Sequence, residues 1–342
     1  MLVIDPTAET GLPTFNCPYV NFSVVHGLHL VQEVDSNIRE EIKKLKNEST
    51  IIVDASRDGW SAEYVQSCTA MFCDITGFKG NFVYLINEFD SGVENAIYFP
   101  LWMHTINDYS KRHKLPAVPE KRRYNMSALI RNPQPHKLML YHSMAREGLL
   151  DREDVLVSYA GLSDAYNAYS CEPLLNTDWF LAHVPKHVAN WLRDTPIRKI
   201  DDCPSGLGNQ GDHTINSPAF MSTYMHIAVE SGFATNFISE KTCKPILAGQ
   251  PFMVAGGPNT MRALRSLGFD TFNHVFGTEG YDSIIDMHKR MAAIAKNARE
   301  NSDHAEEICF ENAREIEHNR LWLASNELTQ KLYKPLIERN LI

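Results

Sequence analysis

Residues 230–257 have the sequence ESGFATNFISEKTCKPILAGQPFMVAGG, and this stretch decides how the rest of the chain is interpreted. It predicts the end of a buried strand, a polar loop, a helix that starts at Ser239, and a second strand after Pro251. Glu240 and Lys241 stand where the loop becomes the helix. A carboxylate and an ammonium in that position can bind a ribose hydroxyl and a phosphate, as α/β proteins do when they hold nucleotides. The stretch therefore indicates a nucleotide-sugar site.

Length and composition predict a soluble globular protein with two domains. The chain has 342 residues, more than one hydrophobic core usually serves, and it is 44% hydrophobic and 22% charged. No stretch approaches the roughly 20 apolar residues that a membrane-spanning helix needs. The first residues also lack a basic segment followed by an apolar run. We therefore expect a cytoplasmic protein without a transmembrane anchor.

Cysteine spacing and net charge weigh against two classes of protein. The seven cysteines are scattered and include no Cys-x-x-Cys pair, so we expect reduced thiols and neither a disulfide framework nor a zinc knuckle. The net charge of −9 disfavours a broad nucleic-acid surface, although the basic stretch 111–123 leaves a local groove open. Four charges in the last third of the chain are expected on a solvated helix face: Arg262, Arg265, Lys289 and Arg290.

Two short apolar runs that end in polar residues predict buried parallel strands at 50–54 and 81–87. Between them, residues 62–72 have the mixed apolar face of a crossover helix. These elements indicate an N-terminal α/β domain, residues 1–115. The stretch 111–123 carries two prolines and no periodicity, and is predicted to be a linker.

A second α/β unit, residues 124–304, restarts the alternation of strands and helices. The predicted strands are 124–131, 154–159, 220–229 and 251–255, and the predicted helices are 136–147, 240–248, 259–267 and 281–296. Residues 305–342 are helical by periodicity and are expected to pack across both domains. The predicted fold is therefore α/β, with two Rossmann-like domains facing a cleft and a C-terminal helical tail.

The first junction that can bind a ligand lies between the strand 124–131 and the helix after it. Arg131 closes the strand, and His136 and Lys137 open the helix. Cations at a helix amino terminus oppose the macrodipole unless an anion lies between them. A diphosphate would remove that conflict.

Two further junctions follow the strand 220–229. Glu230 ends this strand and can accept hydrogen bonds from a sugar or base, and Gly232 permits close backbone approach. Ser239 is the predicted N-cap of the next helix. Taken alone, this last junction is more simply a capped helix with two solvated charges. The three junctions together favour a ligand site at the carboxyl ends of the strands.

The spacing of these residues resembles the donor-binding signature of the α1,3-fucosyltransferases. Ten positions separate Glu230 from Glu240, eleven separate Glu240 from Pro251, and the second strand ends in Gly256 and Gly257. Upstream, the turn at 131–133 followed by Lys137 is similar to that family's Ser-Asn-Pro turn and the phosphate-binding arginine after it. Two positions differ from the pattern, because Ser231 replaces the usual Asn and Lys137 is offset by about one residue. The resemblance covers roughly residues 124–295.

The resemblance implies an inverting glycosyltransferase of the GT-B architecture that needs no metal and no obligatory cofactor. Lys241 would contact the diphosphate of a GDP- or UDP-linked sugar, and Glu240 the ribose or the sugar. Lys137, with Arg131, would take the place of the family's arginine. Glu230 would line the same pocket, with Ser239 and His136 beside it.

The catalytic base is expected on the first domain, since inverting transfer needs a carboxylate that deprotonates the acceptor hydroxyl. In the family this is a glutamate after an early strand. Glu88 follows the strand 81–87 in a comparable place and ranks first. Asp54, which ends the strand 50–54, and Asp58, just after it, are equal to Glu88 on chemistry alone.

The acceptor stays open at this stage. A glycan hydroxyl is the choice that the family implies, and the alternative is a viral enzyme that glycosylates hydroxylated bases in DNA. A second alternative is a sugar-nucleotide epimerase or a non-catalytic nucleotide-binding module, which the same two-domain fold can serve.

Overall fold

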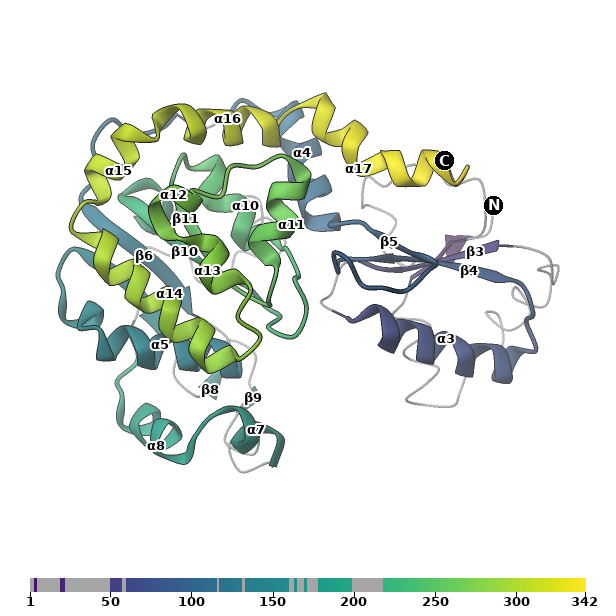
Figure 1. Cartoon of the computed structure of the whole chain (residues 1–342), viewed down its shortest axis with the longest axis horizontal. Helices are drawn as coiled ribbons and strands as arrows, with labels where there is room; N and C mark the ends of the chain where they lie inside the picture. The colour runs from purple at the N-terminus through teal and green to yellow at the C-terminus, as the bar shows by residue number, and fades with distance from the viewer. Residues whose placement is uncertain are drawn as a thin grey trace.

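The computed structural model describes residues 3–4, 19–21, 50–56, 60–115, 117–130, 133–159, 163–164, 169–170, 178–198 and 218–342. Its architecture is α/β, with a five-stranded and a four-stranded sheet whose strands are all parallel (Figure 1). A short antiparallel pair, β8 (Ser163–Asp164) and β9 (Tyr169–Ser170), stands apart from both. The predicted α/β class is confirmed.

The five-stranded sheet keeps its strands in chain order. These are β1 (Val3–Ile4), β2 (Tyr19–Asn21), β3 (Thr50–Ala55), β4 (Asn81–Ile86) and β5 (Ala96–Tyr98). The helix α3 (Ala62–Thr76) crosses from β3 to β4, as parallel pairing requires. Ser61 caps its start by accepting a hydrogen bond from the amide of Tyr64, and Gly77 ends it at φ 73°, where a side chain would be strained.

The two faces of this sheet are buried in different cores. Ile51 and Ile86 pack with α3, whereas Ile52 and Leu85 belong to a larger core that also contains Leu332 of α17 (Asn326–Glu338). Successive residues point to opposite faces of a strand, so the uninterrupted apolar runs are what burial on both faces demands.

The four-stranded sheet has the order β7-β6-β10-β11. Its strands are β6 (Tyr124–Ile130), β7 (Val155–Tyr159), β10 (Thr223–Val229) and β11 (Phe252–Ala255). The connection after β6 leads outward to β7, while β10 pairs with the other side of β6. This reversal is a topological switch point, and open α/β sheets bind ligands outside the strand ends there.

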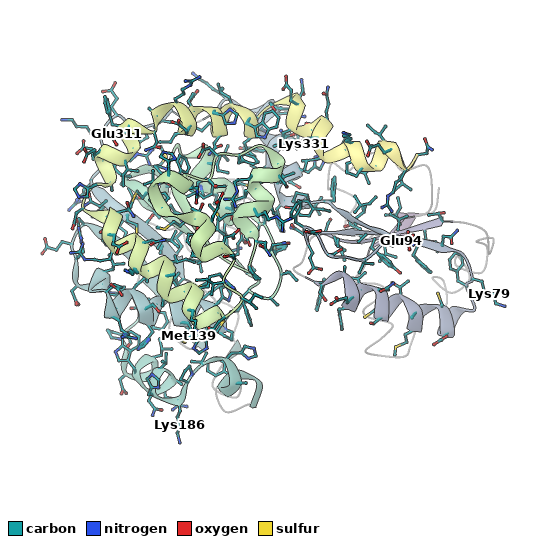
Figure 2. The ribbon with its side chains drawn as sticks, in the orientation of Figure 1. Lys79, Glu94, Met139, Lys186, Glu311 and Lys331 are labelled. Atoms are coloured by element: carbon teal, nitrogen blue, oxygen red, sulfur yellow. The ribbon has the colours of Figure 1, made fainter. Side chains whose placement is uncertain are left out.

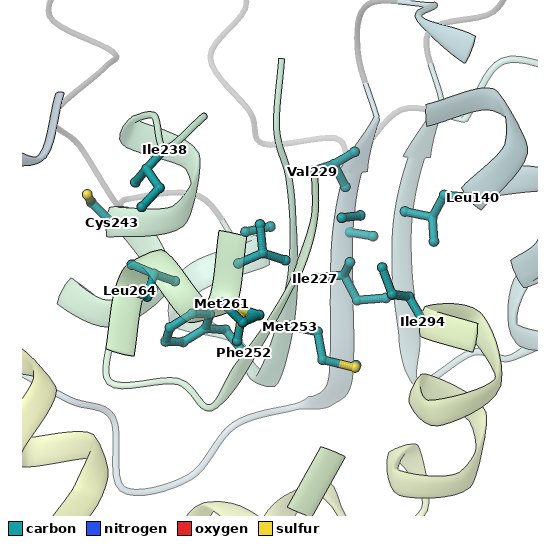
Figure 3. Packing of buried hydrophobic residues seen from close by; sticks show 14 of the residues in the cluster. Leu140, Ile227, Val229, Ile238, Cys243, Phe252, Met253, Met261, Leu264 and Ile294 are labelled. Carbon is teal, nitrogen blue, oxygen red and sulfur yellow. The ribbon is translucent and has the colours of Figure 1, made fainter. Parts of the chain in front are cut away.

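Helices cover both faces of this sheet. Leu140 of α5 (Pro135–Arg146) and Ile294 of α14 (Met287–Ser302) lie on one side, and Leu264 of α11 (Thr260–Leu267) and Cys243 of α10 (Glu240–Leu247) lie on the other (Figure 3). All seven residues of β10 are buried, as expected for a central parallel strand.

The remaining helices connect these units or cover them. They are α4 (Leu101–Arg112), α7 (Asp178–His183), α8 (Lys186–Asp194), α9 (Pro218–Met221), α12 (Asn273–Phe276), α13 (Thr278–Asp282), α15 (Ala305–Glu311), α16 (Ala313–Leu323) and the 3-10 turn η1 (Leu149–Asp151). The prediction of a single helix at 281–296 is wrong in its first residues, since α13 ends at Asp282. A new helix, α14, starts at Met287, and Asp286 caps it by accepting a hydrogen bond from the amide of Lys289.

The C-terminal helices reach both sheets. In Figure 1, α15 and α16 lie along the part of the molecule built on the four-stranded sheet, and α17 extends over the five-stranded one. The buried Asn107 of α4 donates to the carbonyls of Leu323 (2.7 Å) and Ser325 (2.9 Å), at the turn between α16 and α17. Arg339, after α17, donates to the carbonyl of Glu94 (3.2 Å).

One cation of the basic stretch 111–123, Arg122, is a buried structural residue. Arg122 is buried and donates to four carbonyls, those of Phe220, Thr223, Ala248 and Gly249, at 2.6 to 3.2 Å. It therefore adds no charge to a surface groove.

Most other charges project outward, and Figure 2 labels Lys79, Glu94, Lys186, Glu311 and Lys331 among these exposed side chains. Within the described residues, none of the helices has the length and apolar character needed to cross a membrane.

Candidate functional site

The site begins where β6 and β10 end, because the segments after these neighbouring strands contact each other. Nε2 of His136, in the first turn of α5, lies 2.8 Å from the carbonyl oxygen of Glu230, which directly follows β10. A carbonyl only accepts, so Nε2 carries the proton and Nδ1 is a bare acceptor. Within the described residues, Nδ1 has no hydrogen-bond partner. Burial, followed by the charge of Lys137, lowers the pKa of His136 to about 3, so the ring is neutral at pH 7.

Glu230 holds the start of α10. Its side chain is fully buried, and one carboxylate oxygen accepts from the amide of Ser239 (2.9 Å) and the hydroxyl of Thr242 (2.5 Å). The other oxygen accepts from the Ser239 hydroxyl (2.5 Å). A carboxylate that receives the free N–H and O–H groups of a helix start fixes that start in place. Glu230 is thus a positioning residue, and its contact with a ligand stays a prediction.

The first residues of α10 form a tight charged group. Ser239 caps the helix by accepting from the amide of Lys241 (3.3 Å), and Lys241 Nζ lies 2.7 Å from Glu240 Oε1. The Glu240 side chain is only 11% exposed, so it is not a solvated charge. Burial acts to raise the pKa of Glu240, but Lys241 and then Lys244 outweigh it and hold the pKa below its usual value. Glu240 is therefore ionised at pH 7, beside an ammonium group that is one-third exposed.

The loop between β10 and α10 lies directly on the glycines after β11. A Cβ on Gly257 would stand 1.8 Å from the carbonyl oxygen of Thr235, so only glycine fits there. A Cβ on Gly232 would meet nothing closer than 3.5 Å, an ordinary contact. The close approach of two protein segments thus occurs at Gly257, and the approach of a ligand at Gly232 stays a prediction.

Arg290 of α14 is a residue of this site that the sequence prediction missed. It was expected on a solvated face but is 1% exposed. Its guanidinium donates to the carbonyls of Phe233 (3.2 Å), Gly256 (3.0 Å) and Ile284 (2.5 Å), and so ties together the segments after β10 and β11 and before α14. Burial lowers the pKa of Arg290 to about 10, which leaves it charged at pH 7. Arg290 precedes the apolar Ile294 by four residues, so helical periodicity predicts both on the same buried face. The charge of Arg290 favours the opposite prediction, a solvated position.

A cavity of about 610 Å³ opens beside Arg290, a size typical of small-ligand sites. Its walls are formed by Ala182, His183, Phe233, Ala234, Pro258, Ile285, Asp286, Met287, His288 and Lys289. The Phe233 ring contacts both the His136 ring (centroids 5.3 Å apart) and the His183 ring (5.5 Å). The cavity therefore adjoins the switch point, with an apolar wall and a few polar groups.

The structure brings several predicted residues to this edge of the sheet. His136 and Lys137 follow β6, and Lys137 is 3% exposed; Glu230 follows β10, with Ser239, Glu240 and Lys241 at the start of α10. Arg131 lies outside the described residues, so its predicted role is not placed.

The carboxyl end of β4, on the other sheet, meets the loop before α10. Asn87 and Phe89 hydrogen-bond to Ile238 and Asn236, respectively. Glu88 lies between the first two, half-buried, and accepts from the amide of Ala62 (2.7 Å) at the start of α3. Burial raises the pKa of Glu88, with the Ala62 bond acting against it.

Of the two other candidate bases, the structure describes only Asp54. Asp54 is on β3, 4% exposed, and accepts from the amide (2.9 Å) and hydroxyl (2.5 Å) of Ser56. Asp58 lies outside the described residues. Of the two described candidates, Glu88 is the one whose neighbours in the chain bond to the loop before α10.

Buried neutral histidines should make the fold sensitive to acid. Burial lowers the pKa of His136 and of His226 on β10 to about 3, whereas an unfolded histidine titrates near 6.5. Between these values the unfolded chain binds more protons, so stability is complete above pH 6.5 and falls as the pH drops towards 3. We expect a loss of about 1.4 kcal/mol per pH unit for each histidine.

Urea unfolding at pH 7 and pH 5 measures this loss. His226→Gln should remove the part of the pH dependence that His226 contributes, and the same change at the exposed His304, which leaves the buried rings in place, is the control. Equal stability at the two pH values in the wild type would contradict the buried neutral state.

Within the described part of the chain, no three His, Cys, Asp or Glu side chains gather as a metal ion would require.

No protein-family model, curated protein or solved structure matches the chain.

Proposed function

We propose that the protein is an inverting glycosyltransferase of the GT-B architecture, which transfers a sugar from a GDP- or UDP-linked donor to an acceptor hydroxyl. The observation that carries the proposal is the start of α10. There, Glu230 fixes a helix amino terminus that bears Glu240 and Lys241 at a switch point, and the loop before this helix contributes Phe233 and Ala234 to a ligand-sized cavity.

In this proposal the donor lies along the carboxyl edge of the four-stranded sheet. The nucleoside enters the cavity, where Phe233 offers a flat apolar wall. The diphosphate lies over the start of α10, where the helix dipole and the ammonium of Lys241 favour negative charge. Glu240, ionised and held by Lys241, accepts hydrogen bonds from ribose or sugar hydroxyls.

The reaction needs charge stabilisation at the leaving group and a base at the acceptor. As the sugar carbon leaves the diphosphate, negative charge grows on the phosphate oxygens. Cations and helix termini that are already in place stabilise this charge and so lower the activation barrier of the transfer. Glu88 takes the proton of the attacking hydroxyl. Its raised pKa brings it closer to the working pH, which suits a general base.

A glycan hydroxyl is the proposed acceptor. A DNA acceptor has less support, because the net charge is −9 and Arg122 of the basic stretch is buried. For an epimerase, acid and base groups would have to flank the sugar ring. The carboxylate of Glu230, which also lies at the start of α10, is instead occupied by Ser239 and Thr242.

A thermal-shift panel of nucleoside diphosphates and their sugars tests the donor class. A ligand present at a hundred times its dissociation constant should stabilise the fold by roughly 2.7 kcal/mol, because it binds only the folded state. We expect one base, guanine or uracil, to raise Tm as its diphosphate, and the matching nucleoside and free sugar to do so far less. Absence of a shift with every diphosphate, from a protein that unfolds cooperatively, would overturn the proposed function.

A further inference from the structure

Two asparagines join the carboxyl ends of the two sheets by the same pattern of hydrogen bonds in opposite directions. The Asn87 amide donates to the carbonyl of Ile238 (2.8 Å) and accepts from its N–H (3.3 Å). The Asn236 amide donates to the carbonyl of Phe89 (2.8 Å) and accepts from its N–H (2.6 Å). The two segments are residues 87–89 and 236–238. In each segment, the side chain of the first residue bonds to the backbone of the third residue of the other segment. We call these four bonds the amide clamp.

The chemistry of the amide clamp is specific to asparagine. Both side chains are buried, Asn87 at 1% and Asn236 at 6% exposed. An asparagine amide supplies one acceptor and two donors on a short stem, so it can satisfy both the N–H and the C=O of one backbone residue. Aspartate offers only acceptors, and an apolar residue leaves both backbone groups without a partner.

The amide clamp encloses residues to which the proposed function gives roles. Glu88 is the central residue of the first segment, between the two bonded residues Asn87 and Phe89. Ile238, the last residue of the second segment, directly precedes the N-cap Ser239 of α10. The amide clamp therefore holds the backbone on both sides of Glu88 against the segment that leads into α10.

We propose that Asn87 and Asn236 are positioning residues, which hold the carboxylate of the first sheet in register with the ligand-binding start of α10. The inference rests on the proposed function for the roles of Glu88 and Lys241. A displacement of about 1 Å between reacting groups can cost on the order of a hundredfold in rate. The amide clamp thus acts on turnover more than on the affinity for the donor.

Alanine at Asn87 or Asn236 tests this inference, with Asn319→Ala as the matched control. Asn319 is 1% exposed and pairs in the same way with the backbone of Asp270, donating to its carbonyl (2.9 Å) and accepting from its N–H (2.8 Å). It lies in α16 and bonds to Asp270, which is not part of the amide clamp. We expect the clamp variants to lose roughly 10- to 100-fold in kcat with donor KM within about threefold, and Asn319→Ala to lose Tm comparably but keep kcat. A kcat loss no larger than that of the control would overturn the inference.

Hydrogen exchange provides a readout that does not depend on activity. The amides of Phe89 and Ile238 are bonded to Asn236 and Asn87, respectively, so each should exchange faster in the corresponding variant and stay protected in Asn319→Ala. Unchanged exchange would overturn the amide clamp itself. Faster exchange in a protein that turns over no nucleotide sugar would support the clamp and overturn the proposed function. If an alanine variant fails to fold, aspartate at the same position retains the size while placing an oxygen against a carbonyl, and Asn319→Asp is its control.

Discussion

Lys241→Met should weaken the binding of a nucleoside diphosphate roughly 10- to 100-fold, since hydrogen bonds to charged groups contribute about 1.5–3 kcal/mol. Methionine keeps the apolar stem and removes only the ammonium, which lies at the start of α10 beside Glu240. The Lys241 side chain is 33% exposed, so salt should screen part of its effect. Titration calorimetry at low and at physiological ionic strength measures both the loss and its salt dependence.

Two comparisons make the Lys241 result specific. Lys296→Met removes a cation from the exposed face of α14, where Lys296 is 67% exposed and lies near Glu300, and should change the affinity less than about twofold. The free nucleoside should bind both variants almost as it binds the wild type, because it carries no phosphate. A Lys241→Met protein that binds the diphosphate with unchanged affinity would remove Lys241 from the site.

Glu88→Gln should lower the single-turnover rate about 10²- to 10⁴-fold, the usual contribution of a positioned base, and leave donor affinity unchanged. Glutamine keeps the length and one acceptor oxygen, so the bond from the amide of Ala62 can persist while the basic group is lost. Rapid-quench measurement of sugar transfer, with the dissociation constant of the donor from calorimetry, separates the two effects.

The same assay decides among the carboxylates of the first sheet. Glu63→Gln, in the first turn of α3, should turn over normally, because it changes a neighbouring charge and no group in contact with the reaction. Asp54→Asn tests the competing base on β3 directly. A large loss in Asp54→Asn with a small loss in Glu88→Gln would move the base from β4 to β3.

The fold was largely predictable where burial alone shapes the sequence. The apolar runs at 50–54, 81–87 and 124–131 predict β3, β4 and β6 within about a residue, because strands covered on both faces tolerate few polar residues. The run 220–229 starts three residues too early for β10, since its first apolar residues belong to α9. The predicted helix 281–296 includes the turn between α13 and α14. The apolar periodicity continues through the polar cap residue Asp286, so the pattern gives no sign of the break.

The site was predictable only in part. The residues at the strand ends and helix starts could be found from spacing, since topology brings carboxyl ends of parallel strands to one edge. The pairing of Asn87 with Ile238 spans 151 positions, and a hydrogen bond between such distant residues leaves no local pattern in the sequence. The sequence predicts that Arg290 is solvated because charge usually lies at the surface, whereas its buried guanidinium is bonded to three segments.

A crystal structure of the protein with the nucleoside diphosphate that gives the largest thermal shift tests the proposed site most directly. The proposal predicts phosphate oxygens within hydrogen-bond distance of Lys241 Nζ, and the base against Phe233. A diphosphate bound at any other place, with the carboxyl edge of the four-stranded sheet filled by solvent alone, would contradict it.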